Sequence, residues 1–157
     1  MAPAPGKRPV SGPDLAARTL RSARVVASAL ACGAALLAAA AAWAPPMQRV
    51  PALVTPASLA GLVGLPVALR LHRTLRDRAA AGSDPGARAA AYVRSLAVAL
   101  GVTEALACVG IVAFLFSRAP FCLTGLATHA ILTGALWPTP EAVRQALDSC
   151  VSSGEDP

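Results

Sequence analysis

Four long apolar stretches constrain the fold of this 157-residue chain more than any other feature. They cover residues 25–43, 50–71, 93–117 and 121–137, and nearly all charged side chains lie outside them. A helix needs about 17–25 mostly apolar residues to cross the hydrocarbon of a bilayer. Only 14% of the residues are charged, whereas soluble domains carry roughly 25%. The pattern predicts an all-α membrane protein, a bundle of four transmembrane helices.

The basic residues predict how this bundle is oriented. Twelve of the fourteen lysines and arginines lie in the N-terminal segment, the central loop and its flanks, or the C-terminal tail, whereas Arg49 and Arg118 occupy the two opposite loops. Cytoplasmic loops of membrane proteins carry the excess of Lys and Arg. Both termini are therefore expected in the cytoplasm of a multi-pass protein of the bacterial inner membrane. Trp43 and Trp137 lie where tryptophans anchor spans at the membrane interface.

The chain divides into three parts. Residues 1–24 form a flexible basic segment, in which Asp14 is expected to cap a short helix ending at Leu20. Residues 25–137 form the transmembrane domain. Residues 138–157 form a cytoplasmic tail with a short amphipathic helix capped by Thr139, which either lies on the membrane surface or is solvated.

The first apolar stretch has two interpretations. A retained span is favoured because the apolar run is longer than the 7–15 residues of a signal peptide. The small residues of AAAAAWA also permit a cleaved signal peptide.

Prolines and polar residues predict the helix ends. Thr55 is expected to cap a helix from Pro56, and Pro66 is expected to kink it. Ser83 or Asp84, followed by Pro85, predicts the start of the third helix. The pairs Ala29/Gly33 and Ala60/Gly64 predict close helix packing.

Glu104 is the one acidic residue inside an apolar stretch. It lies ten residues after Arg94 and fourteen before Arg118, which places it near the membrane midplane. An ionised carboxylate there costs a few kcal/mol, so Glu104 should face the bundle. Two interpretations remain open: a proton- or cation-binding carboxylate, or a hydrogen-bonded glutamic acid that joins two helices.

His129 lies in the fourth stretch, on the other arm of the turn at Arg118. Counting from that turn at 1.5 Å per residue leaves an axial offset of about 7 Å between Glu104 and His129. A helix tilt, long side chains or one water could bridge this offset, with Thr124, Thr128 and Thr133 nearby. The alternative is a lone histidine that forms a hydrogen bond across helices.

Other chemistry is not indicated. The four cysteines form no CxxC pair, and no disulfide framework, metal site or cofactor site is predicted. The chain contains no phosphate-binding loop, HExxH motif or accessible catalytic triad, so no catalytic residue and no enzyme activity are expected. The arginines are not interleaved with aromatic residues, and nucleic-acid binding is not expected.

Two resemblances accompany these patterns. The stretch TEALACVGIVAFLFSRAPF, which contains Glu104, resembles the carboxylate helix of subunit c of rotary ATP synthases, a family in which a protonatable carboxylate drives ring rotation. The likeness covers about twenty residues; the preceding helix lacks the glycine repeat of that family, and a fourth span follows. The region 87–147 is similar to a family of small, uncharacterised four-span bacterial membrane proteins through EALACVG and WPTPEAVRQAL. This similarity implies a topology and no chemistry.

The sequence supports two functional hypotheses. The first is a small polytopic membrane protein with a structural or accessory role, whose partners are membrane lipids and either other membrane subunits or further copies of itself. The second is a proton- or cation-binding or translocating element centred on Glu104, with His129 as its candidate companion.

Overall fold

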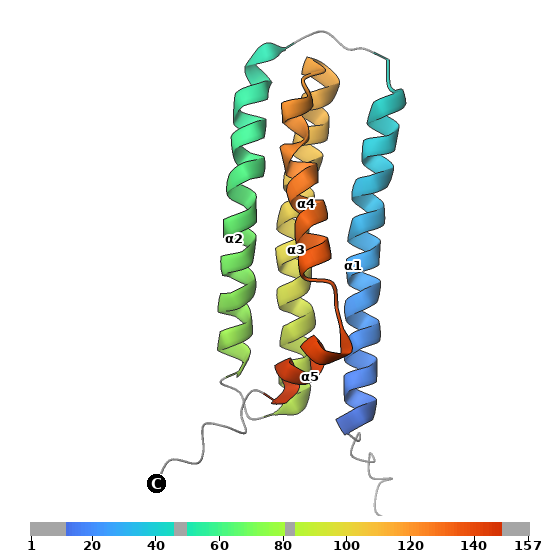
Figure 1. Ribbon diagram of the computed structural model, residues 1–157, viewed down its shortest axis with the longest axis vertical. Helices are drawn as coiled ribbons and strands as arrows, with labels where there is room; N and C mark the ends of the chain where they lie inside the picture. The colour runs from blue at the N-terminus through green and yellow to red at the C-terminus, as the bar shows by residue number, and fades with distance from the viewer. Residues whose placement is uncertain (1–11, 46–49, 81–83, 149–157) are drawn as a thin grey trace, which may run out of the picture.

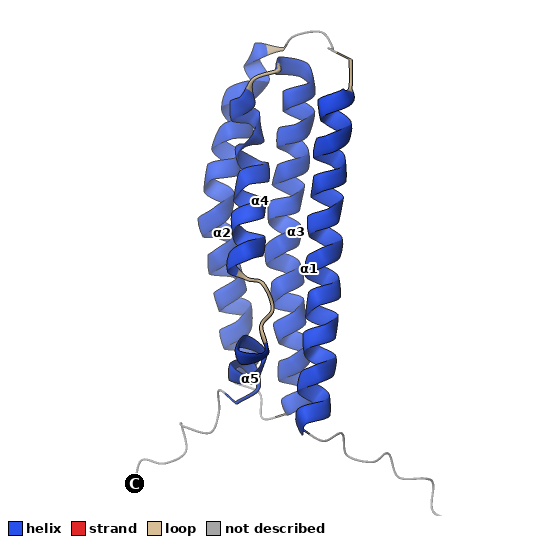
Figure 2. Ribbon diagram, turned by 45° about the vertical axis from the view of Figure 1, so that its right-hand side comes forward, coloured by secondary structure: helices blue, strands red, loops and turns tan. Residues whose placement is uncertain are grey.

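The structure, a computed structural model, describes residues 12–45, 50–80 and 84–148. Every element in these ranges is helical (Figure 2), which confirms the all-α class. Four helices lie along a common axis (Figure 1): α1 (Gly12–Trp43), α2 (Val54–Ala80), α3 (Pro85–Ser117) and α4 (Thr124–Ala135).

Three shorter helices complete the described part of the chain. They are the 3-10 turns η1 (Pro51–Leu53) and η2 (Pro120–Leu123), which precede α2 and α4, and α5 (Pro140–Asp148). α5 lies against the end of the bundle where α1 and α3 begin (Figure 1). We call this end the α5 end, and the opposite end, which contains the turn after α3, the Arg118 end.

α1, α2 and α3 are each long and apolar enough to cross a membrane. α4 and α5 together give a fourth candidate, but only as a pair bent by 73°. By length and composition, the structure therefore has three to four helices that could span a bilayer.

α1 is one continuous helix, contrary to the short separate helix expected to end at Leu20. It begins at Gly12, so Asp14 lies in its first turn and is not its cap. The basic segment and the apolar stretch merge because Arg18 to Val25 contain no proline or glycine to stop the helix. Ala23 and Ala27 of α1 are fully buried against α3 and its neighbours.

α2 starts earlier than expected. Its first residue is Val54, after the turn η1, so the prediction that Thr55 caps a helix at Pro56 is wrong. The helix continues through Pro66. At Ser58 the hydroxyl lies 2.8 Å from the carbonyl oxygens of Val54 and Phe121, which links the start of α2 to η2.

α3 starts and ends where the sequence predicts, but the backbone conformation of the residue after it was not predicted. The Asp84 carboxylate accepts hydrogen bonds from the backbone N–H groups of Gly86 and Ala87, at 3.3 and 2.9 Å, and Pro85 takes the first helical position. The helix ends at Ser117, and the next residue, Arg118, has a left-handed backbone conformation with φ 56°. Glycine usually occupies this position, because a side chain there is strained.

α4 packs against α2 and α3 through glycines. A Cβ atom added to Gly61 would collide with the backbone nitrogen of Gly125, and one added to Gly110 would collide with the carbonyl oxygen of Cys122. At Gly125 an added Cβ would lie 2.6 Å from the carbonyl oxygen of Leu106. These three glycines therefore let the backbones approach closely, as small residues do between membrane helices.

The fourth apolar stretch is not a full-length helix over 121–137. The helix α4 has 12 residues, and with η2 the helical stretch covers only 120–135. After α4 the chain passes through Pro138, which is fully buried and whose carbonyl oxygen accepts a hydrogen bond from Arg24 Nε at 3.3 Å. Such non-helical backbone is tolerated at membrane depth where protein covers it.

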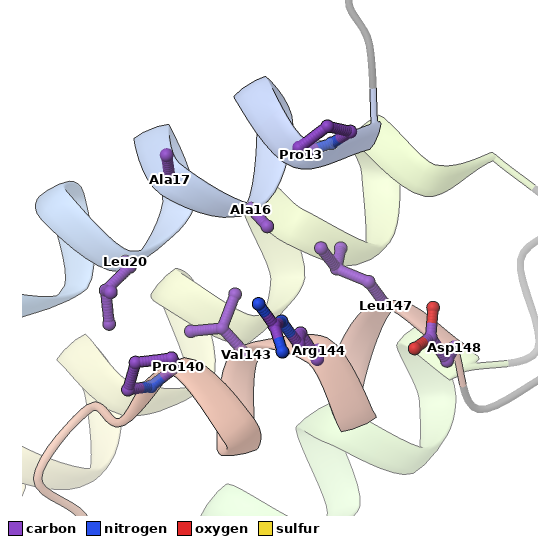
Figure 3. A pocket seen from close by; sticks show the side chains of 9 residues that line it. All are labelled: Pro13, Ala16, Ala17, Leu20, Pro140, Val143, Arg144, Leu147 and Asp148. Atoms are coloured by element: carbon purple, nitrogen blue, oxygen red, sulfur yellow. The ribbon is translucent and has the colours of Figure 1, made fainter.

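α5 is capped as predicted, and one of its faces is buried against the bundle, so it is not a fully solvated helix. Ala142 N–H donates to Thr139 Oγ1 at 3.1 Å. Its apolar face packs on α1 and α3, with Val143 1% exposed. Figure 3 shows Leu20 of α1 and Val143 of α5 pointing into a cleft of about 470 Å³ between the two helices. The tail helix is thus part of the bundle.

Candidate functional site

Glu104 lies on α3 and faces α1 near the middle of the bundle. A Cβ atom added to Gly33 of α1 would lie 2.7 Å from Glu104 Oε1, so the absence of a side chain at Gly33 makes room for the carboxylate. Glu104 itself is half-buried. The expectation that this acid faces another helix is met, and the predicted small residue Gly33 is its immediate neighbour.

His129 lies on α4 and is only 2% exposed. Its Nδ1 is 3.0 Å from Oγ1 of Thr103, the residue next to Glu104 on α3. The imidazole therefore has a direct partner across the helix interface, and this partner is the threonine. Thr103 was not among the residues predicted for this site.

The Thr103 hydroxyl offers two arrangements of protons. Its oxygen also lies 3.0 Å from the carbonyl oxygen of Leu100. If Thr103 donates to Leu100, the imidazole carries its proton on Nδ1 and donates it to Thr103; if Thr103 donates to Nδ1, the proton is on Nε2. Either way one ring nitrogen, Nε2, remains for a further interaction.

Nε2 of His129 is buried and has no hydrogen-bond partner in the described part of the chain. Thr133 Oγ1, one helical turn further along α4, is also buried and equally without a partner there. Glu104 of α3 and the backbone of Leu30 on α1 lie near His129, but neither makes a hydrogen bond with its Nε2. Buried polar atoms of this kind call for a water, an ion or a change of protonation.

These residues form what we call the three-helix junction: Leu30 and Gly33 of α1, Thr103 and Glu104 of α3, and His129 and Thr133 of α4. Its chemical capacity is narrow. One carboxylate and one imidazole can exchange or share a proton, and together with one hydroxyl they can position a water. Within residues 12–45, 50–80 and 84–148, no three His, Cys, Asp or Glu side chains gather as metal ligands.

Two of the threonines expected near His129 serve another interface. Thr128 donates to the carbonyl oxygen of Gly61 at 2.9 Å, and Thr124 donates to that of Ser58 at 3.2 Å. Both bonds join α4 to α2. Only Thr133 lies on the His129 side, one helical turn away.

The two tryptophans lie at helix ends, as interfacial anchors do. Trp43 is the last residue of α1 and is 90% exposed, and Trp137 follows α4 and is 42% exposed. Their role as anchors stays a prediction.

Arg118, which was expected only as a loop charge, forms a second polar centre. Its guanidinium donates to the carbonyl oxygens of Ala44 at 2.6 Å and Ala41 at 3.4 Å, and so binds the last turn of α1. The guanidinium carbon also lies 5.5 Å from the centre of the Phe114 ring. A cation at a helix C-terminus interacts favourably with the helix dipole, so Arg118 joins the ends of α1 and α3. The sequence feature that could have indicated this role is an arginine at the start of the turn Arg118-Ala119-Pro120.

The three described cysteines have free thiols. Cys32 is exposed, Cys108 is half-buried, and buried Cys122 lies 3.2 Å from Ser117 Oγ. Cys150 lies outside the described residues.

No protein-family model, curated protein or solved structure matches this chain. The two resemblances drawn from its motifs therefore stay predictions.

Proposed function

We propose that this chain is a multi-pass protein of the bacterial inner membrane with a structural or accessory role, and that both termini lie in the cytoplasm. The observation that carries the proposal is the apolar outer surface of the bundle. Leu36, Val63, Val109 and Ile131, from four different helices, are 71%, 56%, 52% and 60% exposed. An apolar surface on every side of a bundle is unfavourable in water and fits lipid or partner helices.

The orientation follows from the charges at the two ends. Arg18, Arg21 and Arg24 of α1 and Arg73, Arg76 and Arg78 of α2 lie toward the α5 end, whereas Arg118 is bound to carbonyl oxygens at the other. In the positive-inside arrangement the α5 end is cytoplasmic. The fourth crossing is made by η2, α4 and the covered linker through Pro138.

Fractionation and a reporter test this proposal. The chain should stay in the membrane pellet after an alkaline carbonate wash, and green fluorescent protein fused to its C-terminus should fluoresce. Release by carbonate would contradict the membrane assignment. A C-terminal alkaline phosphatase fusion that is active would reverse the orientation while leaving the membrane assignment intact.

A second candidate function is proton binding at the three-helix junction. Two observations favour it: Glu104 directly follows Thr103, whose hydroxyl lies 3.0 Å from Nδ1 of the buried His129 ring, and Nε2 of His129 has no hydrogen-bond partner among the described residues. A proton could reside on either group. In this role Glu104 resembles the carboxylate of subunit c in chemistry alone.

Glu104→Gln separates the two functions, because glutamine keeps the shape and hydrogen-bonding capacity of the side chain but cannot ionise. Packing should tolerate it. A proton site should lose pH-dependent flux in proteoliposomes and lose modification by a carbodiimide. The matched control is Glu141→Gln on the exposed side of α5, which removes the same charge far from the junction. Equal flux for wild type and Glu104→Gln would refute proton handling.

A further inference from the structure

A groove between α1 and α3 combines basic, hydroxyl and apolar side chains near the α5 end. Its volume is about 430 Å³. Its lining consists of Arg18, Thr19, Ser22, Ala89, Ala90, Val93, Arg94 and Ala97. We call it the basic groove.

The charges of the basic groove come from two different helices. Arg18 on α1 and Arg94 on α3 are both exposed, and no carboxylate is among the lining residues. Ser22 is also exposed, whereas the Thr19 hydroxyl donates to the carbonyl oxygen of Leu15 at 2.8 Å and keeps its oxygen as an acceptor. Arg18, Ser22 and Arg94 therefore offer donors and positive charge, which fits an anion.

The floor of the groove is apolar and leads into the predicted membrane span. Ala89 is 6% exposed, and Val93 and Ala97 are half-buried. Val93 is the first residue of the expected third span, and Arg18 lies seven residues before the first, about 10 Å along the helix. The anionic end and the apolar end of a ligand would thus lie at the headgroup level and at the edge of the hydrocarbon.

We propose that the basic groove binds one anionic phospholipid, with its phosphate between Arg18 and Arg94 and the start of an acyl chain over Val93 and Ala97. This proposal rests on the proposed membrane location. Basic pockets between membrane helices at the cytoplasmic face suit anionic headgroups. Arginine suits a phosphate because its planar group can donate two parallel hydrogen bonds.

A second groove of the bundle supplies a contrast. It lies between α2 and α3 toward the Arg118 end, has a volume of about 590 Å³, and is lined by Leu53, Pro56, Ala57, Ala60, Cys108, Val109, Val112 and Ala113. It contains no charged residue. It can contact acyl chains of any lipid, and it gives no reason to prefer an anionic one.

Native mass spectrometry of the full chain in detergent tests the proposal. Phosphatidylglycerol is added in competition with phosphatidylcholine of the same acyl chains. The double variant Arg18→Gln/Arg94→Gln is compared with Arg73→Gln/Arg78→Gln, which removes two exposed arginines of α2 that line neither groove. We expect one phosphatidylglycerol bound to wild type and to the α2 variant. In the groove variant we expect affinity about thirtyfold weaker, since each of the two arginines near a membrane surface contributes about 1 kcal/mol.

The remaining outcomes each count against the proposal. Equal weakening in both double variants would mean a general charge effect and would overturn the groove. Equal retention of the two lipids by wild type would do the same. Displacement of the lipid by millimolar glycerol phosphate or inorganic phosphate would show an anion site without lipid specificity. The carbonate wash distinguishes failure of the proposed membrane location from failure of the lipid-binding proposal, because its result does not depend on Arg18 or Arg94.

Discussion

The helix α4 and the helix α1 pack against the rest of the bundle in different ways. At α4, a Cβ atom added to Gly61, Gly110 or Gly125 would meet backbone atoms. At α1, a Cβ atom added to Gly33 would meet only the end of the Glu104 side chain. A glycine in a helix interface can therefore contact either a backbone that cannot move or a side chain that can. The two cases are distinguished by whether the nearest atom of the neighbouring helix belongs to its backbone or to a side chain.

α1 depends instead on polar contacts at separate levels. Arg24 donates to Pro138 near the α5 end, Glu104 lies beside Gly33 in the middle, and Arg118 donates to Ala41 and Ala44 at the other end. Between these levels the buried side chains of α1 are small, namely those of Ala27 and Ala34. We expect α1 to be easier to displace than α4.

The largest effect should come from filling the α4 interface. We expect Gly125→Leu to cost more than the about 1–3 kcal/mol typical of overpacked cores, because the backbone of Leu106 and Ala107 would have to move. The control is Gly134→Leu on the same helix, where nothing lies within 4 Å of the added Cβ. Thermal unfolding in detergent, followed by helical circular dichroism, measures both. Equal midpoints would show that the α4 interface adapts, and the contrast with α1 would fail.

Arg118→Asn should have the next largest effect, confined to α1. Asparagine tolerates the left-handed conformation of residue 118, so the turn is kept while the guanidinium is lost. Hydrogen bonds to charged groups contribute about 1.5–3 kcal/mol. Because Arg118 is partly exposed, we expect its loss to cost an amount at the low end of this range. Hydrogen exchange should accelerate in the last turns of α1 and stay unchanged in α3. Faster exchange spread evenly over both helices would mean that Arg118 supports the whole bundle.

The parts of this fold that the sequence predicts are local ones. Asp84 and Thr139 are recognisable as caps because each acts on backbone groups two or three residues away. The helical class follows from the apolar stretches. The continuity of α1 is not evident from the sequence because arginines mark the boundary of its apolar stretch, although arginine is a good helix former.

The parts that could not be predicted depend on register between helices. The rise of an α-helix put Glu104 and His129 about 7 Å apart along the bundle, yet the structure bonds His129 to Thr103, the neighbour of Glu104. The four residues of η2 form a 3-10 helix, which rises about 2.0 Å per residue instead of 1.5 Å and so recovers only about 2 Å of this offset. The same register decides that Thr124 and Thr128 face α2.

The bond between Thr103 and His129 should have a smaller effect than Arg118. A double-mutant cycle with Thr103→Val and His129→Phe isolates it, and a neutral hydrogen bond predicts a coupling energy of about 0.5–1.5 kcal/mol. The unfolding free energies of the four proteins in the cycle are measured in detergent. Thr128→Val, with its separate bond to Gly61, should show no coupling to His129→Phe. A coupling energy near zero for Thr103 would leave His129 held by packing alone.

Gly33→Ala should have the smallest effect, and it is the direct counterpart of Gly125→Leu. The added methyl group would meet Glu104 Oε1, but a carboxylate at the end of a flexible side chain can rotate away. Replacing glycine by alanine inside a helix also contributes about 0.5–1 kcal/mol of stability, so we expect a change in unfolding free energy close to zero. Glu104→Gln/Gly33→Ala should behave like Glu104→Gln, since the same rotation relieves both. If Gly33→Ala alone destabilised the bundle as much as a backbone clash, the carboxylate would be fixed in place, and α1 would be held as rigidly as α4.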